Sequence, residues 1–160
     1  MRSTVLLVTS ALIFCSPVYA QEKVSKEQLV GTWTMVSYKN VSGGSKADIF
    51  GPQPKGMLMV DAGGRYIFSY VDPRRSAWKT DNRTQVPDAD LATAAKGVVT
   101  QFGTISLEGN TVTRKIDGSI NPSLREQKVT VSLSGDEVTF TNPNSGVTGG
   151  QVETTFRRAK

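Results

Sequence analysis

The chain is a series of short runs in which apolar and polar residues alternate, separated by turn-forming residues. Alternation with a period of two places successive side chains on opposite faces of a strand. It is clearest in residues 65–71, where Tyr66, Phe68 and Tyr70 share one face and Gly63 and Gly64 precede them in a hairpin turn. The pattern predicts eight strands, at residues 31–41, 57–60, 65–71, 103–107, 111–117, 126–133, 137–141 and 151–158.

One segment has the period of a helix instead. After Pro87, the apolar residues of segment 88–100 fall on one narrow stripe: Leu91, Ala94, Ala95 and Val98. This stripe predicts one short helix, over about residues 88–100, laid against the end or side of a sheet. The capping-box pattern of Ser25 and Gln28 predicts a further helical turn before the first strand.

The number of predicted strands limits the architecture. Eight antiparallel strands close naturally into a barrel, whose interior is filled with side chains or holds one small ligand. We therefore predict an all-β fold: an eight-stranded, antiparallel, up-and-down barrel with one short helix.

The first 20 residues have the three parts of an export signal. Arg2 is followed by an apolar stretch at residues 5–14 and by a small-residue cleavage site ending at Ala20. We expect cleavage there, an exported protein (periplasmic or secreted), and one barrel domain over residues 21–160. The apolar stretch is short for a bilayer, so we expect no integral span in the mature chain. A retained anchor is the alternative.

Composition excludes several kinds of chemistry. The chain has no histidine, and its one cysteine, Cys15, lies within the predicted signal. The mature chain therefore lacks a thiol nucleophile, a histidine-based triad, a disulfide and Cys/His zinc sites. We expect no metal, no cofactor and no catalytic residue. The net charge of +5 favours anionic ligands, but the basic residues are too scattered to indicate nucleic acid.

Seven motifs follow one another along nearly the whole mature chain. They occupy residues 29–33, 50–56, 64–65, 94–97 with 102–104, 119–122, 127 and 133–140. In this order they resemble the lipocalin-like domain family of the calycin group, as a small exported bacterial-type member. The resemblance implies an eight-stranded barrel with a central cavity. Four positions differ from the family pattern. The family usually has tyrosine where this chain has Gln101 and Ile105, histidine where it has Arg114, and arginine where it has Val129.

Two ends of the barrel domain are predicted to meet. Gly31 and Trp33 open the first strand, and Arg158 closes the last. A guanidinium over the indole would close the narrow end of the barrel by a cation–π contact, so these three residues are expected to be structural.

Arg114 is the candidate anchor for a ligand. It alternates with Val112 and Ile116, so it faces inward if they do. A cation in an apolar interior needs an anion or acceptors, which a ligand carboxylate or phosphate would supply. The alternatives are Asp117, a glutamate or backbone carbonyls, or a strand that faces outward.

Aromatic residues are predicted to complete the ligand site. Tyr66, Phe68 and Tyr70 would line one wall, with core filling as the alternative. Trp78 lies in a cationic loop and would guard the mouth, unless it packs on the barrel. We thus expect a protein that binds a small hydrophobic or amphipathic, possibly anionic, molecule. A scaffold with a packed barrel that acts through its loops is one alternative. A barrel enzyme of isomerase, cyclase or hydratase type is the other, and a non-enzyme is favoured.

Overall fold

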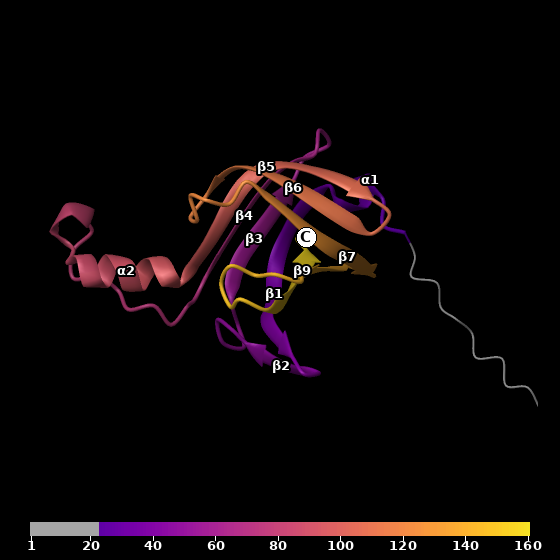
Figure 1. The fold of residues 1–160 in the computed structure, drawn as a ribbon. Coiled ribbons are helices and arrows are strands. Elements are labelled where there is room, and N and C mark those ends of the chain that lie inside the picture. Colours follow the sequence, from indigo (N-terminus) through magenta and orange to yellow (C-terminus); the bar gives the residue numbers. More distant parts are fainter. Residues whose placement is uncertain (1–22) are drawn as a thin grey trace, which may run out of the picture.

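Eight antiparallel strands form a closed barrel in the computed structural model of the chain (Figure 1). The structure describes residues 23–160, so the predicted export signal lies outside the described residues. The barrel strands are β1 (Gly31–Ser42), β3 (Lys55–Val60), β4 (Arg65–Val71), β5 (Val98–Glu108), β6 (Thr111–Ser119), β7 (Glu126–Ser134), β8 (Glu137–Asn142) and β9 (Gln151–Arg158). The predicted all-β barrel is confirmed.

Strand β1 closes the barrel because it pairs on both of its edges. Its first residues pair with β3, from Gly31 opposite Val60 to Thr34 opposite Met57. Its longer part pairs with β9, from Trp33 opposite Arg158 onward. A short extra strand, β2 (Ser45–Asp48), pairs only with the far end of β1. Closure leaves no long free edge at which another strand could add.

The helices differ in part from the prediction. The one-turn helix α1 (Lys26–Leu29) has the expected capping box, in which Ser25 and Gln28 exchange hydrogen bonds of 3.3 and 2.8 Å. The predicted helix over 88–100 is shorter, as α2 (Asp88–Lys96), and residues 98–100 instead begin β5. Gly97 ends the helix, and the β-branched residues Val98, Val99 and Thr100 that follow favour a strand.

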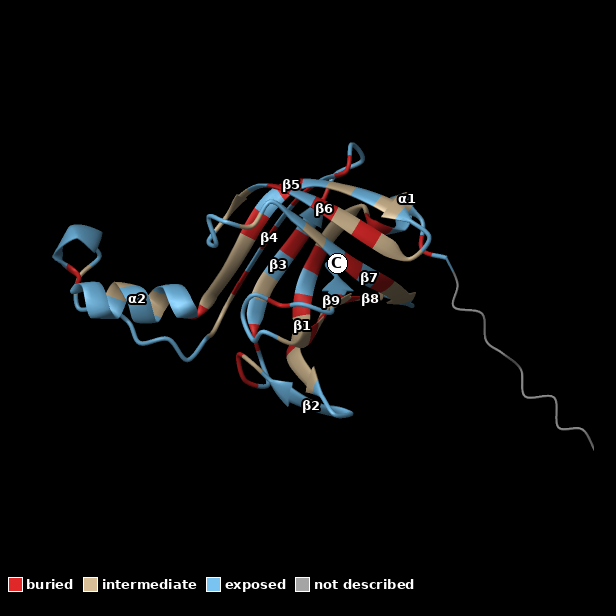
Figure 2. Cartoon of the chain, viewed as in Figure 1, coloured by how far each residue is buried: buried red, intermediate tan, exposed pale blue. Residues whose placement is uncertain are grey.

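The predicted packing of this helix on the sheet is wrong. No residue of α2 is buried, and α2 extends away from the barrel (Figure 2). Its stripe of alanines and one leucine offers little apolar area, so packing it on the sheet would give little stabilisation.

Side chains alternate between the interior and the solvent along each barrel strand. In β4, the buried residues are Tyr66, Phe68 and Tyr70, and the residues between them are exposed. The fully buried side chains that fill one end of the interior include Trp33, Val112, Val131 and Val138. This packed end contrasts with the opposite end, where the interior is hollow.

Arg158 and Trp33 seal the packed end, as their spacing predicted. The guanidinium carbon of Arg158 lies 4.1 Å from the centroid of the Trp33 ring, and Trp33 is fully buried. Arg158 also donates hydrogen bonds to the carbonyl oxygens of Val30 (2.9 Å) and Gln28 (2.7 Å) at the end of α1. Gly31 has φ +134°, and a Cβ there would lie 2.8 Å from Nη1 of Arg158, so the contact requires glycine.

We predict that Arg158→Met lowers the free energy of unfolding by about 1–2 kcal/mol, because a cation–π contact and two charged hydrogen bonds are lost. Urea denaturation measures this change. Arg157→Met is the matched control, since Arg157 makes an exposed ion pair with Glu137 and should cost less than about 1 kcal/mol. Equal losses in the two variants would contradict the sealing role of Arg158.

Candidate functional site

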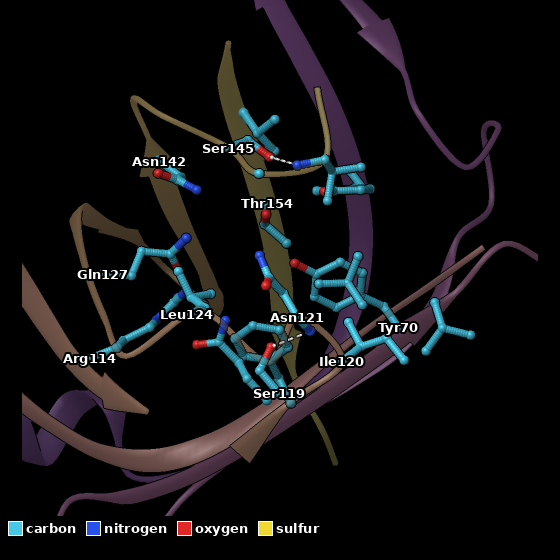
Figure 3. A pocket seen from close by; sticks show the side chains of 18 of the residues that line it. Tyr70, Arg114, Ser119, Ile120, Asn121, Leu124, Gln127, Asn142, Ser145 and Thr154 are labelled. Atoms are coloured by element: carbon cyan, nitrogen blue, oxygen red, sulfur yellow. Dashed lines mark hydrogen bonds between the residues drawn. The ribbon is translucent and has the colours of Figure 1, made fainter. Parts of the chain in front are cut away.

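The hollow end of the barrel contains a cavity of about 460 Å³ (Figure 3). Ligand pockets in proteins have volumes of roughly 300–1,000 Å³, so this cavity is large enough for a small molecule. Its lining residues come from most of the barrel strands, from the end of α2 and from the loops after β6 and β8. They are Tyr38, Phe68, Tyr70, Ala95, Lys96, Val98, Val99, Gln101, Arg114, Ser119, Ile120, Asn121, Leu124, Gln127, Val129, Phe140, Asn142, Ser145, Gly146, Val147, Val152 and Thr154.

Arg114 lies deep in this cavity and has no acidic partner. Its side chain enters the interior from β6, and the residue is only 8% exposed. The guanidinium carbon lies 4.9 Å from the ring centroid of Phe140 and 5.1 Å from that of Phe68. Among residues 23–160, its one hydrogen bond goes from Nη1 to Oε1 of Gln127, at 3.1 Å. The described residues place no carboxylate within ion-pair distance of it, so neither Asp117 nor a glutamate satisfies this cation.

Burial makes the charged state of Arg114 less favourable than it is in water. Removal of the guanidinium from water lowers the pKa of Arg114 from its ordinary value. A lowered pKa means that the folded chain binds this proton less tightly than the unfolded chain does. The charge therefore destabilises the empty protein at neutral pH.

Two amide side chains present hydrogen-bond donors to the cavity. Arginine can only donate, so Gln127 must turn its oxygen toward Arg114 and its NH₂ group away. Gln101 on β5 is buried, and its oxygen accepts a 2.7 Å hydrogen bond from the hydroxyl of Tyr66. Both amide oxygens are thus used within the protein, and both NH₂ groups are left to donate. Together with Arg114 they form a set of donors that suits an anion.

Phe68 and Tyr70 form an aromatic wall beside this donor set. Their rings are stacked, with centroids 5.1 Å apart. The ring of Tyr38 packs against Tyr70 at 4.9 Å. Burial raises the pKa of Tyr70 and of Tyr38, and it raises the pKa of Tyr66 to about 12. All three phenols therefore stay neutral across the physiological pH range.

The lining of the cavity has one sign of charge. Among the residues that line it, the ionised side chains are Arg114 and the exposed Lys96 at the end of α2, and there is no aspartate or glutamate. A cavity with only positive charges and low-dielectric walls attracts anions.

A comparison with protein-family models agrees with the barrel and its cavity. The model of the lipocalin-like domain matches residues 30–158, which is most of the chain. The chain belongs to the lipocalin-like domain family. A search of the curated proteins found no match. The family therefore accounts for the fold, and the residues of this lipocalin-like barrel must indicate its ligand.

The structure brings together some of the residues predicted for the site, but not all. Arg114, Phe68 and Tyr70 line the cavity. Tyr66 does not line it and lies behind Gln101, whose amide it orients. Trp78 lies beside α2 near Asp90 and Thr93, away from both the cavity and the barrel wall. It neither guards the mouth nor packs on the barrel, because the loop that holds it follows α2 outward.

Several lining residues were not predicted as site residues. Gln101 and Gln127 are polar residues within inward-facing apolar series, the same signal that identified Arg114. Of the four positions that differ from the family pattern, Gln101, Arg114 and Val129 line the cavity. These three lining side chains therefore differ from the tyrosine, histidine and arginine that the resemblance implies.

Two searches of the described residues bear on other kinds of site. No helix among residues 23–160 is long and apolar enough to cross a membrane. Within the same residues, no cluster of three or more aspartate, glutamate, histidine or cysteine side chains could hold a metal ion.

We predict that Arg114→Met stabilises the ligand-free protein by about 1–2 kcal/mol, because a buried charge without an anion is replaced by an apolar side chain of similar length. Urea denaturation of protein stripped of bound molecules by solvent extraction measures this change. A destabilised variant would instead assign Arg114 a structural role in the barrel.

Proposed function

We propose that this lipocalin-like barrel binds a small amphipathic anion. The carboxylate or phosphate of the ligand accepts hydrogen bonds from Arg114, and its apolar part lies against the aromatic and aliphatic side chains of the cavity. The observation that carries the proposal is the buried guanidinium of Arg114, which has one hydrogen bond, to an amide, and no acidic partner within the part of the chain that the structure describes.

The remaining donors of Arg114 support this assignment. A guanidinium has five N–H donors, and only one hydrogen bond from Arg114 is present. No fully enclosed side-chain nitrogen or oxygen among the described residues lacks a hydrogen-bond partner. The unused donors of Arg114 are therefore accessible from the cavity. An anion placed there would be held by charge-assisted hydrogen bonds.

The apolar lining supports an amphipathic ligand over a simple inorganic anion. Phe68 and Phe140 lie beside Arg114, and Val129 and Val152 line the same cavity. Water in contact with these side chains is released when an alkyl or aromatic group takes its place, at about 25 cal/mol per Å² of apolar surface covered.

The alternative functions have less support. A scaffold with a packed barrel requires a filled interior, whereas this interior is partly hollow. An enzyme would need an acid or base with a suitably shifted pKa in the cavity. Burial raises the pKa of Tyr70, so this phenol is suited to donating a hydrogen bond rather than to transferring a proton.

We predict that the protein binds decanoate at least tenfold more tightly than decanol at neutral pH, because only the acid carries a charge for Arg114. Arg114→Met should weaken decanoate binding by roughly tenfold to a hundredfold and leave decanol binding nearly unchanged. Isothermal titration calorimetry gives these affinities, and decyl phosphate tests the choice of head group. Unchanged decanoate binding in Arg114→Met would contradict the proposal.

Gln101→Glu serves as a second variant in the same assay. Its carboxylate would keep the hydrogen bond from Tyr66 and would offer Arg114 an anion within the protein. Decanoate should then bind more weakly although no contact to its alkyl chain has changed.

We also propose that the protein is exported after removal of residues 1–20, on the evidence of the signal-like pattern at its start. The expected product has the intact mass of residues 21–160 and is found outside the cytoplasm. Mass spectrometry of fractionated cells tests this, and a cytoplasmic protein of full-length mass would contradict it.

A further inference from the structure

The segment between β4 and β5 projects from the open end of the barrel (Figure 1). It comprises residues 72–97, includes the short helix η1 (Arg83–Gln85) and α2, and is called the arm below. Only Val86 and Gly97 of the arm are buried. The arm therefore adds little to the core of the barrel, and packing does not explain its composition.

The arm combines an exposed tryptophan with basic residues. Its loop, residues 73–87, contains four basic residues and one aspartate, a net charge of +3, whereas the whole arm, with Asp72, Asp88, Asp90 and Lys96, has a net charge of +1. Arg74 is paired with Asp72, but Arg75, Lys79 and Arg83 have no ion pair among the described residues. Trp78 follows Arg75 and precedes Lys79 in this segment, lies near Arg75 and Asp90, and is 38% exposed.

The rim of the cavity also carries exposed apolar side chains. Ile120 and Val147 lie on the loops after β6 and β8, line the mouth of the cavity and are nearly half exposed. Residues 120–125 and 143–150 of these loops contain one charged residue, Arg125, and no acid. The open end thus presents scattered large apolar side chains with basic residues around them.

We propose that the open end docks on the surface of an anionic phospholipid bilayer, and that the ligand of the cavity passes between the bilayer and the barrel there. This inference rests on the proposed binding of an amphipathic anion. Trp78 takes the interfacial position that tryptophan prefers, and Arg75, Lys79 and Arg83 lie near the lipid phosphates. The mouth, with Ile120 and Val147, then faces the apolar boundary in which an amphipathic ligand resides.

The charge pattern of the open end favours a membrane over a second protein. The core of a protein interface is depleted in charged residues and contiguous in its apolar surface. The exposed tryptophan of the arm is instead isolated, in a loop of net charge +3, which suits a surface of anionic head groups. A contiguous apolar patch is present elsewhere, on the outer face of β3, β4 and β5, where Met59, Ile67 and Phe102 lie opposite one another on adjacent strands.

Vesicle cosedimentation tests this docking surface. The mature protein is mixed with vesicles of phosphatidylcholine containing about one-third phosphatidylglycerol, and with vesicles of phosphatidylcholine alone. We expect binding to the anionic vesicles that is roughly tenfold weaker for Trp78→Ser and for the double variant Lys79→Glu/Arg83→Glu. Ile67→Ser, which removes an apolar side chain 49% exposed on the outer face, is the matched control and should bind like the wild type.

Decanoate titrations without vesicles separate this inference from the proposed function. The variants of the arm lie outside the cavity, so they should bind decanoate normally, which also shows that they are folded. Arg114→Met should still bind anionic vesicles. If neither the wild type nor any variant binds decanoate, the proposed function is refuted, but the docking surface is not.

Three results would overturn the docking surface. The first is a wild type that does not bind anionic vesicles. The second is Trp78→Ser binding these vesicles as tightly as the wild type does. The third is Ile67→Ser losing as much vesicle binding as Trp78→Ser. Self-association of the wild type that Trp78→Ser abolishes, without vesicle binding, would assign the surface to a second copy of the chain instead.

Discussion

A guanidinium enclosed by aromatic rings needs an anion, and the interior of this barrel does not supply one. Arg114 lies between Phe68 and Phe140, with a glutamine oxygen as its one hydrogen-bond acceptor. Cation–π contacts and an amide dipole recover only part of the free energy that the charge loses on leaving water. The cavity beside Arg114 and the amide donors of Gln101 and Gln127 leave room and partners for the anion that we propose.

The contrast with Arg158 shows how the same residue type serves two purposes in one barrel. Arg158 covers the indole of Trp33 and donates to two carbonyl oxygens at the end of α1, so its donors have partners within the chain. Arg114 has rings around it but few acceptors. The first arrangement stabilises the closed end. The second lowers the stability of the protein and leaves donors that the proposed anionic ligand would use.

Much of this architecture is readable from the sequence because strand alternation is local. The inward positions of β4 and β6 need only a period of two, whereas the contact of Trp33 with Arg158 was expected from the likeness to lipocalin-type barrels. Tyr38 was missed because a bulge between Met35 and Ser37 shifts the alternation of β1 by one residue. Strand β2 was missed because all four of its residues are exposed, so only its backbone pairing with β1 defines it. The position of Trp78 depends on where the arm points, which no local pattern specifies.

Some residues of the candidate site could likewise be predicted from the sequence, and others could not. Alternation identified Arg114, but the role of Gln101 depends on a hydrogen bond from Tyr66 on the neighbouring strand, and such partners are known only once the strands are placed. The absence of a carboxylate from the lining of the cavity is likewise a property of the assembled barrel.

The pKa of a bound carboxylate tests most directly whether Arg114 binds the head group of the ligand. Decanoate labelled with ¹³C at its carboxyl carbon can be titrated in the complex and followed by NMR. If the carboxylate lies against Arg114, it should stay ionised well below the ordinary pKa of a carboxylic acid, about 4–5, and Arg114→Met should raise this value. A bound carboxyl that titrates as in free solution, and that does not respond to Arg114→Met, would place the head group in water at the mouth and contradict the account.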